Sequence, residues 1–175
     1  MLFWHLGGTV AIARYAFRDE RMDLRFLALG ALLPDLIDKP IAYFVFERYN
    51  ATRLWGHTLI FASLLMVAVL LLTRRGRPRR RWMAVTVGVL IHLILDFSWA
   101  APETLVWPFL GWDFTTIPTN EGSYVNAVLS DPWRWIQEFV GLAYLVVLAR
   151  RADLGSVEPR TRLLQTGQID VPIGR

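Results

Sequence analysis

The sequence predicts an all-α integral membrane helical bundle with about five main helices, a short interfacial helix and a loop rich in tryptophan and proline. The chain has 175 residues, 54% of them hydrophobic, and its mean hydropathy is +0.36. It contains eight tryptophans, a residue type enriched where helices meet the membrane surface. Together these observations favour a membrane bundle over the alternative, a soluble bundle.

Five apolar runs provide the main helices. They cover residues 2–17, 26–37, 57–73, 82–97 and 135–149. Pro40 predicts the end of the second helix, because proline lacks a backbone N–H and clashes with the preceding turn. Asp131-Pro132 predicts the start of the fifth. The runs are roughly 12 to 17 residues long, against the ~20 needed to span a bilayer, so some helices are expected to cross it only partly.

The remaining segments are predicted from composition. Residues 41–53 are short and aromatic and predict an interfacial or re-entrant helix. Residues 99–118 hold tryptophan and proline at a density typical of a loop at a membrane interface. We therefore expect a single membrane domain over residues 1–150 and a loosely ordered cytoplasmic tail over residues 151–175.

The arginines predict the orientation. Six of the eight residues 74–81 are arginine, and further arginines lie within residues 18–25 and after Ala149. Basic residues concentrate on the cytoplasmic side of membrane proteins, so these connections predict a multi-pass protein of the inner membrane with its arginine side in the cytoplasm. Membrane lipids are the expected partners, and nucleic acid is not expected. The opposite connections hold few basic residues: Lys39, Arg48, Arg53 and Arg134.

The candidate ligands for a metal ion all fall at the non-cytoplasmic ends of the predicted helices. The chain has no cysteine, which excludes disulfides, thiolate zinc sites and a cysteine nucleophile, so a metal must be held by histidine, aspartate or glutamate. Ionisable residues inside membrane segments mostly serve function. The six candidates are His5, Asp35, Asp38, His57, His92 and Asp96.

His92 and Asp96 are the most informative pair, because residues four apart project from one face of a helix and can bind one ion. Imidazole and carboxylate ligands favour zinc, with manganese or iron as alternatives. Six candidates suggest one or two ions. Two metal ions about 3.5–4 Å apart activate a water molecule and bind the attacking and the leaving oxygen in phosphoester hydrolysis. The alternative for His92 and Asp96 is a buried hydrogen-bonded couple that rigidifies the bundle.

The order of motifs resembles the YdjM-like family of membrane-bound metal-dependent hydrolases over residues 2–114. The matching elements are His5, GALLPDLID (30–38), GHTL (56–59), HLILD (92–96) and WPF (107–109). In ligand order that family is similar to the zinc-dependent phospholipases C and the single-strand-specific zinc nucleases. The resemblance implies that His57, His92, Asp96 and one of Asp35 and Asp38 hold one metal, while His5 and a shared aspartate help hold another.

The function expected from these residues is a membrane-embedded metal-dependent hydrolase, with a phosphoester of a lipid or lipid-linked molecule as the favoured substrate. Arg53 and Glu103 are candidates for phosphate binding and proton transfer, with solvated surface positions as the alternative. A second reading is a non-catalytic membrane protein that binds or conducts a divalent cation. Only Ser63 and Thr86 add polarity toward the cytoplasmic side in the third and fourth runs, which favours an enzyme or a static site over a conduit.

Overall fold

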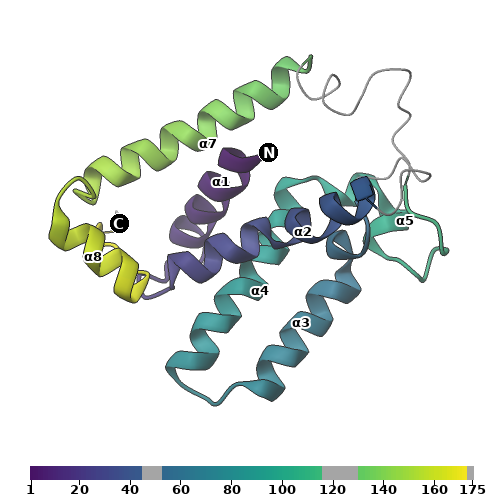
Figure 1. Cartoon of the computed structure of the whole chain (residues 1–175), viewed down its shortest axis with the longest axis horizontal. Helices are drawn as coiled ribbons and strands as arrows, with labels where there is room; N and C mark the ends of the chain where they lie inside the picture. The colour runs from purple at the N-terminus through teal and green to yellow at the C-terminus, as the bar shows by residue number, and fades with distance from the viewer. Residues whose placement is uncertain (45–52, 116–129, 173–175) are drawn as a thin grey trace.

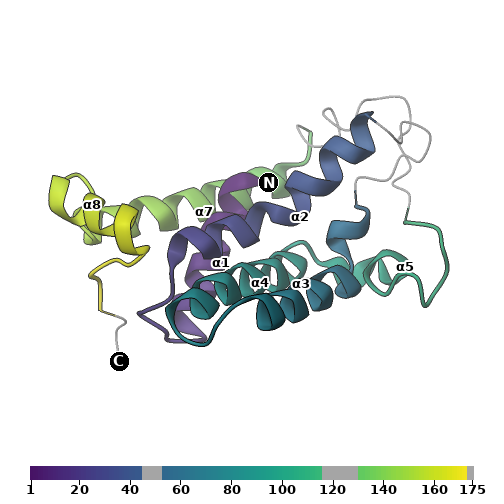
Figure 2. The same ribbon diagram turned by 60° about the horizontal axis from the view of Figure 1, so that its bottom comes forward.

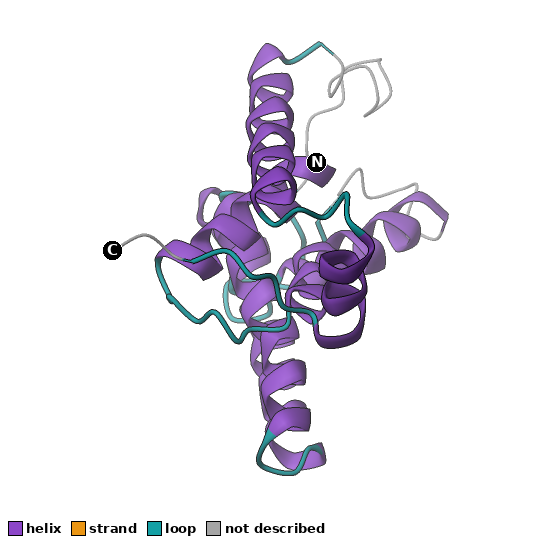
Figure 3. Ribbon diagram, turned by 90° about the vertical axis from the view of Figure 1, so that its left-hand side faces the viewer, coloured by secondary structure: helices purple, strands orange, loops and turns teal. Residues whose placement is uncertain are grey.

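The structure is a computed structural model that describes residues 1–44, 53–115 and 130–172. Within these ranges the chain forms helices joined by loops and has no strand, so the predicted all-α class is confirmed (Figure 3). The long helices are α1 (Leu2–Tyr15), α2 (Leu24–Phe44), α3 (Leu59–Leu72), α4 (Arg77–Leu95) and α7 (Pro132–Arg151). The short elements are η1 (Trp55–His57), η2 (Ser98–Ala100), α5 (Pro102–Leu105) and α8 (Val157–Thr166).

Helix α2 lies at the centre of the bundle (Figures 1 and 2). It packs on α4, which pairs with α3, and on α1, which in turn carries α7. Two small apolar clusters form the core. One joins α1, α2 and α4 through Val10, Ala13, Leu27 and Ala84. The other joins α3 to α4 through Ala62, Val89 and Leu93.

Glycines allow two pairs of helices to touch backbone to backbone. A Cβ atom on Gly30 of α2 would lie 2.1 Å from the carbonyl oxygen of Val85 in α4. In the same way, a Cβ on Gly7 of α1 would lie 2.4 Å from the carbonyl oxygen of Gly141 in α7. Small residues at helix crossings permit this close approach. These glycines therefore set the short distance between α2 and α4 and between α1 and α7.

The predicted end of the second helix at Pro40 is wrong. Helix α2 continues through Pro34 and Pro40 to Phe44, although an internal proline costs about 3 kcal/mol. Tertiary contacts on the same stretch offset that cost. The buried carboxylate of Asp38 accepts backbone hydrogen bonds from the segment around η1, and Lys39 pairs with Asp35 one turn away. Residues 41–44 therefore belong to α2, and the rest of the predicted interfacial helix, 45–52, lies outside the described residues.

Two other boundaries differ from the predictions. Helix α4 begins at Arg77 instead of residue 82, because Pro78 stands in the first turn, where its fixed φ suits a helix. In the segment expected to be a loose tail, residues 157–166 form α8, which ends at Gly167 in the left-handed conformation. The carbonyl oxygen of Gly167 accepts a hydrogen bond from the amide of Leu24, which ties this segment to α2.

The start of α7 agrees with the sequence. The side chain of Asp131 accepts a hydrogen bond from the amide of Trp133 and so caps the helix that begins at Pro132. The predicted tryptophan- and proline-rich loop contains η2 and α5, and its end near Pro118 lies outside the described residues.

Membrane-spanning helices were also predicted. Over the described ranges, no single helix combines the length and the apolar character that crossing a bilayer requires.

Replacing Gly30 by alanine tests the α2–α4 crossing. The added methyl group would meet the backbone of Val85, so we expect the free energy of unfolding to fall by about 1–3 kcal/mol. Denaturant unfolding in a constant detergent measures the change. Gly155→Ala is the matched control, because nothing lies within 4 Å of the position of its Cβ. Equal stability of the two variants would show that the crossing is not tight.

Candidate metal centre

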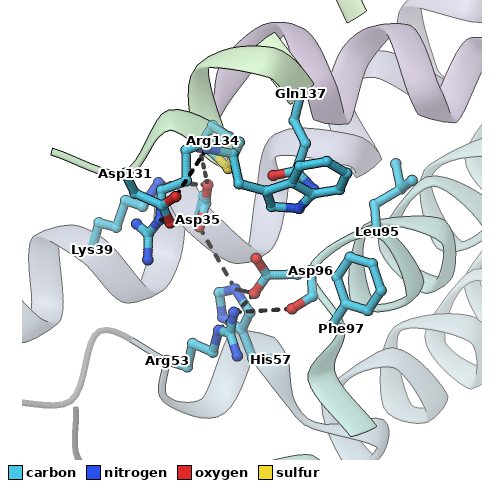
Figure 4. Close-up of a pocket in the computed structure, with 12 residues that line it drawn as sticks. Asp35, Lys39, Arg53, His57, Leu95, Asp96, Phe97, Asp131, Arg134 and Gln137 are labelled. Atoms are coloured by element: carbon cyan, nitrogen blue, oxygen red, sulfur yellow. Dashed lines mark hydrogen bonds and ion pairs between the residues drawn. The ribbon is translucent and has the colours of Figure 1, made fainter. Parts of the chain in front are cut away.

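The candidate site lies where the start of α1, the second half of α2, the turn η1 and the end of α4 meet. His5 comes from α1, Asp35 from α2, His57 from η1, and His92 and Asp96 from the end of α4. The three histidine side chains are at most 2% exposed, and the two aspartates are 19% exposed. The aspartates therefore form the open side of the site, and the buried imidazoles lie behind them; Figure 4 shows Asp35, Asp96 and His57 of this set.

Asp38 fixes the position of His57. Its fully buried carboxylate accepts hydrogen bonds from the amides of Leu54 at 2.7 Å and Gly56 at 2.8 Å, and from the amide of His57 at 3.2 Å. The Nδ1–H of the His57 ring donates to the same carboxylate at 2.6 Å. Gly56 is needed for this approach, because a Cβ there would lie 2.9 Å from Asp38 Oδ1. With its Nδ1 used in this way, His57 turns the lone pair of Nε2 into the site.

His92 is oriented by the backbone of α2. Its Nδ1 lies 2.7 Å from the carbonyl oxygen of Ala31, which can only accept, so Nδ1 carries the proton. The Nε2 atom of His92 is then unprotonated and lies 3.2 Å from Nε2 of His57. Two lone pairs face each other at contact distance. This arrangement is repulsive unless a cation or a proton lies between them.

His5 adds a third imidazole. Its ring stacks on His92 with the ring centroids 4.2 Å apart, and its Nδ1 hydrogen-bonds to the carbonyl oxygen of Met1. Its Nε2 is buried and has no hydrogen-bond partner among the described residues. It lies 3.9 Å from Oδ1 of Asp96. A buried polar atom without a partner is costly, so this nitrogen is also placed for a ligand that the polypeptide does not supply.

The two carboxylates approach the same nitrogen. Asp35 Oδ1 and Asp96 Oδ2 each lie 3.6 Å from Nε2 of His57. Both are also held by cations, Asp35 through its other oxygen and Asp96 through the same oxygen. Lys39 Nζ is 2.6 Å from Asp35, and Arg53 Nε is 2.7 Å from Asp96. These ion pairs orient the carboxylates and leave one oxygen of Asp35 directed at the imidazoles.

Burial and the neighbouring charges set the protonation of the site. Burial, followed by the nearby His5 and His57, lowers the pKa of His92 to about 3. Burial also lowers the pKa of His5. For Asp35, burial acts to raise the pKa, but Lys39 outweighs it together with smaller contributions, and the pKa falls to about 2. At neutral pH the lowered pKa values leave His5 and His92 as neutral imidazoles and Asp35 as a carboxylate, which are the forms that bind metal ions.

These residues fit a metal ion. Asp35, His57 and His92 each offer one ligand atom, and the three atoms lie within 4.8 Å of one another. Two imidazole nitrogens bound to a tetrahedral zinc at 2.0–2.1 Å are roughly 3.3–3.4 Å apart, close to the 3.2 Å between the two Nε2 atoms. His5 stacks on His92 and Asp96 lies 3.6 Å from Nε2 of His57, so both could extend the site.

The structure brings five of the six predicted ligands together. The sixth, Asp38, lies behind His57, where its oxygens accept hydrogen bonds from N–H groups. Of the two other candidates, Arg53 contacts Asp96, donating also to its carbonyl oxygen at 2.9 Å. Glu103 is exposed on α5 and accepts a hydrogen bond from Thr115, away from the cavity.

Helix α7 contributes residues that the sequence did not indicate. A cavity of about 170 Å³ opens beside Asp35 and Asp96, and α7 lines it with Asp131, Trp133, Arg134 and Gln137 (Figure 4). In the sequence, Gly7 and Gly141 are the residues that could have indicated this position of α7, because small residues allow two helices to cross closely, as α1 and α7 do here.

The fold and the site define an all-helical protein with a buried cluster of histidines and aspartates that could hold a metal ion. The sequence model of the YdjM inner membrane protein family matches residues 2–154, so the chain belongs to that family. No curated protein and no solved structure matches the chain.

The protonation of His92 predicts how stability depends on pH. In the unfolded chain His92 gains a proton near its ordinary pKa of 6.5, whereas in the folded protein it does so only near 3. Between these values the unfolded state binds more protons, so the free energy of unfolding of metal-free protein should fall as the pH drops from 6.5 toward 3. Asp35 adds a loss only below its ordinary value of 3.8.

Denaturant unfolding in the presence of a chelator, at a series of pH values, measures this slope. His92→Gln should show a flatter decline than the wild type above pH 4, the region that Asp35 leaves unaffected. A variant that declines as steeply as the wild type would contradict the prediction.

Proposed function

We propose that this protein is a metal-dependent hydrolase of the inner membrane that cleaves a phosphoester bond in a lipid or lipid-linked substrate. One observation carries the proposal: the Nε2 atoms of three imidazoles and the carboxylates of two aspartates lie close to one another, at the edge of a cavity that Asp35, Asp96 and His57 line. A site built only for stability would pair these nitrogens with donors. Zinc is the favoured ion, with manganese or iron as alternatives, in a site for one or two ions.

Asp35, His57 and His92 would hold one ion, and His5 with Asp96 would complete the site or help hold a second. Asp38 acts through His57, since a carboxylate that binds the far nitrogen of a ligating histidine fixes its ring and raises its basicity. When bound, such an ion supplies Lewis acidity and activates water at neutral pH. We also propose that the order of the metal ligands along the chain is similar to that in the zinc-dependent phospholipases C and the single-strand-specific zinc nucleases.

Three cationic side chains favour an anionic substrate. Lys39, Arg53 and Arg134 line the cavity, and each is paired with an aspartate of the cavity wall. Guanidinium groups match the oxygens of a phosphoryl group in geometry and charge. The cavity volume of about 170 Å³ accommodates a phosphate and its immediate substituents, so the remainder of a lipid-sized substrate would extend outside.

Exposed apolar side chains near the cavity favour a lipid. Phe97 and Trp133 line it and are 48% and 62% exposed, and Trp135 and Phe139 on another face of α7 are 46% and 65% exposed. Apolar surface of this kind marks a contact with a membrane or another apolar partner. The arginines of the α3–α4 connection lie at the far end of α4, roughly 28 Å from Asp96, which supports a cavity at the non-cytoplasmic face.

Metal content tests the site. Detergent-purified wild type, offered zinc and manganese, should retain about one or two equivalents by mass spectrometry, and His92→Ala should lose them. Asp38→Asn should still bind metal, with an affinity about 10–100-fold lower, because it weakens the support of His57 and of the η1 turn but removes none of the proposed ligands. Asp113→Asn, an exposed position away from the cavity, is the control. A folded wild type without metal, or full metal in His92→Ala, would overturn the assignment.

Activity separates the hydrolase from a non-catalytic cation-binding protein. Metal-loaded wild type should hydrolyse bis(4-nitrophenyl) phosphate and short-chain phospholipids, and Asp96→Asn should reduce kcat/KM about 100-fold or more. Arg134→Gln should raise KM about tenfold with unchanged metal content, because it removes a charge that binds substrate and touches no ligand. Metal-loaded wild type that hydrolyses no phosphoester would leave the cation-binding function as the better explanation.

A further inference from the structure

A second cavity lies at the opposite end of the bundle and is lined by arginines. Its volume is about 430 Å³. Arg77, Arg80 and Arg81 come from the first turns of α4, and Arg21 comes from the connection between α1 and α2. Among the residues that the structure describes, Asp23 is the one acidic residue that lines it. The lining is therefore strongly positive.

The acidic groups nearby are already neutralised. Asp23 is only 4% exposed, and its carboxylate accepts hydrogen bonds from Arg25 at 2.7 and 3.0 Å. Arg25, which does not line the cavity, and Arg81, whose Nε lies 3.4 Å from Oδ2, both pair with Asp23. Asp19 in turn pairs with Arg80 at 2.6 Å. Arg21 and Arg77 remain in excess over the carboxylates of the cavity.

The C-terminal segment forms a fixed wall of this cavity. Thr166 and Gln168 line it, and the side chain of Gln168 donates to the carbonyl oxygen of Arg21 at 3.0 Å. Gly167 between them packs against Asp23, where a Cβ would lie 1.7 Å from Oδ1. These residues lie beyond the 2–154 region that matches the family. The cavity is thus completed by a part of this chain that the family description does not cover.

We propose that this cavity binds the phosphate group of an anionic ligand. Arginine forks match phosphate oxygens in pairs, and the positive end of the α4 dipole, at Arg77, adds to the attraction. Exposed apolar residues border the arginines: Leu71 and Leu72 at the end of α3 are 78% and 84% exposed, and Trp82 is 44% exposed. An anionic phospholipid presents a phosphate beside apolar chains, and a small soluble phosphate presents the same group alone.

Titration of detergent-purified full-length protein, followed by native mass spectrometry, tests this binding. The probes are phosphatidylglycerol, zwitterionic phosphatidylcholine and inorganic pyrophosphate. The test variant is Arg21→Gln/Arg77→Gln, and the matched control is Arg74→Gln/Arg75→Gln, which removes the same charge from exposed arginines that do not line the cavity. We expect about tenfold weaker binding of the anionic probe in the test variant and wild-type binding in the control.

The outcomes are distinct. Preference for phosphatidylglycerol alone identifies a lipid headgroup, and binding of pyrophosphate as well identifies a general phosphate site; either supports the proposal. Equal weakening in both double variants, or no preference for anionic probes over phosphatidylcholine, overturns it, because diffuse charge would then explain the binding. Arg77→Gln alone is a second test variant, since this residue is exposed and its loss leaves the wall intact. Metal content, measured in parallel, should not change.

Discussion

A single buried carboxylate, that of Asp38, joins α2 to the turn that carries His57. Burying a charge is costly unless donors surround it, and here three backbone amides and one imidazole N–H do so. The same set of bonds shapes the turn, holds α2 straight beyond Pro40 and selects the tautomer of His57. Loss of this carboxylate would leave the amides and the ring without an acceptor. The local fold and the chemistry of the site therefore depend on one group.

Backbone contacts between helices set the remaining distances. His92 reaches the carbonyl oxygen of Ala31 because α2 and α4 cross at Gly30 and Gly88, where side chains would hold them apart. α7 closes over the cavity because α1 and α7 meet at Gly7 and Gly141. The positions of the imidazoles thus follow from glycines that have no chemical role of their own. Rigid crossings of this kind keep ligand atoms in place without a bound ion.

Much of the site could be predicted, because ionisable residues in apolar runs have few uses. The spacing of His92 and Asp96 predicted one helical face, and both side chains reach the cluster. The sequence could not separate Asp35 from Asp38, since both lie on the same stretch of α2 and only the fold of η1 decides which one faces the imidazoles. Lys39 pairs with Asp35 one turn away on α2.

The parts that the sequence missed depend on contacts between distant segments. Local preference ended the second helix at Pro40, but hydrogen bonds from residues 54–57 outweigh it. The C-terminal segment looked polar and aperiodic, yet Gly167 and Gln168 anchor it to the α1–α2 connection. Arg134 reaches the cavity only because α7 lies across α1. No local pattern encodes these long-range pairings.

The groups around the metal centre also have a defined electrical balance. Asp35, Asp38 and Asp96 supply three negative charges, and Lys39 and Arg53 supply two positive ones, while the ion pair from α7 cancels itself. Each divalent ion that the cluster binds adds two positive charges to this balance. A phosphodiester then brings back one negative charge, and a phosphomonoester dianion brings back two. The number of ions held by the cluster therefore decides which phosphate charge it neutralises.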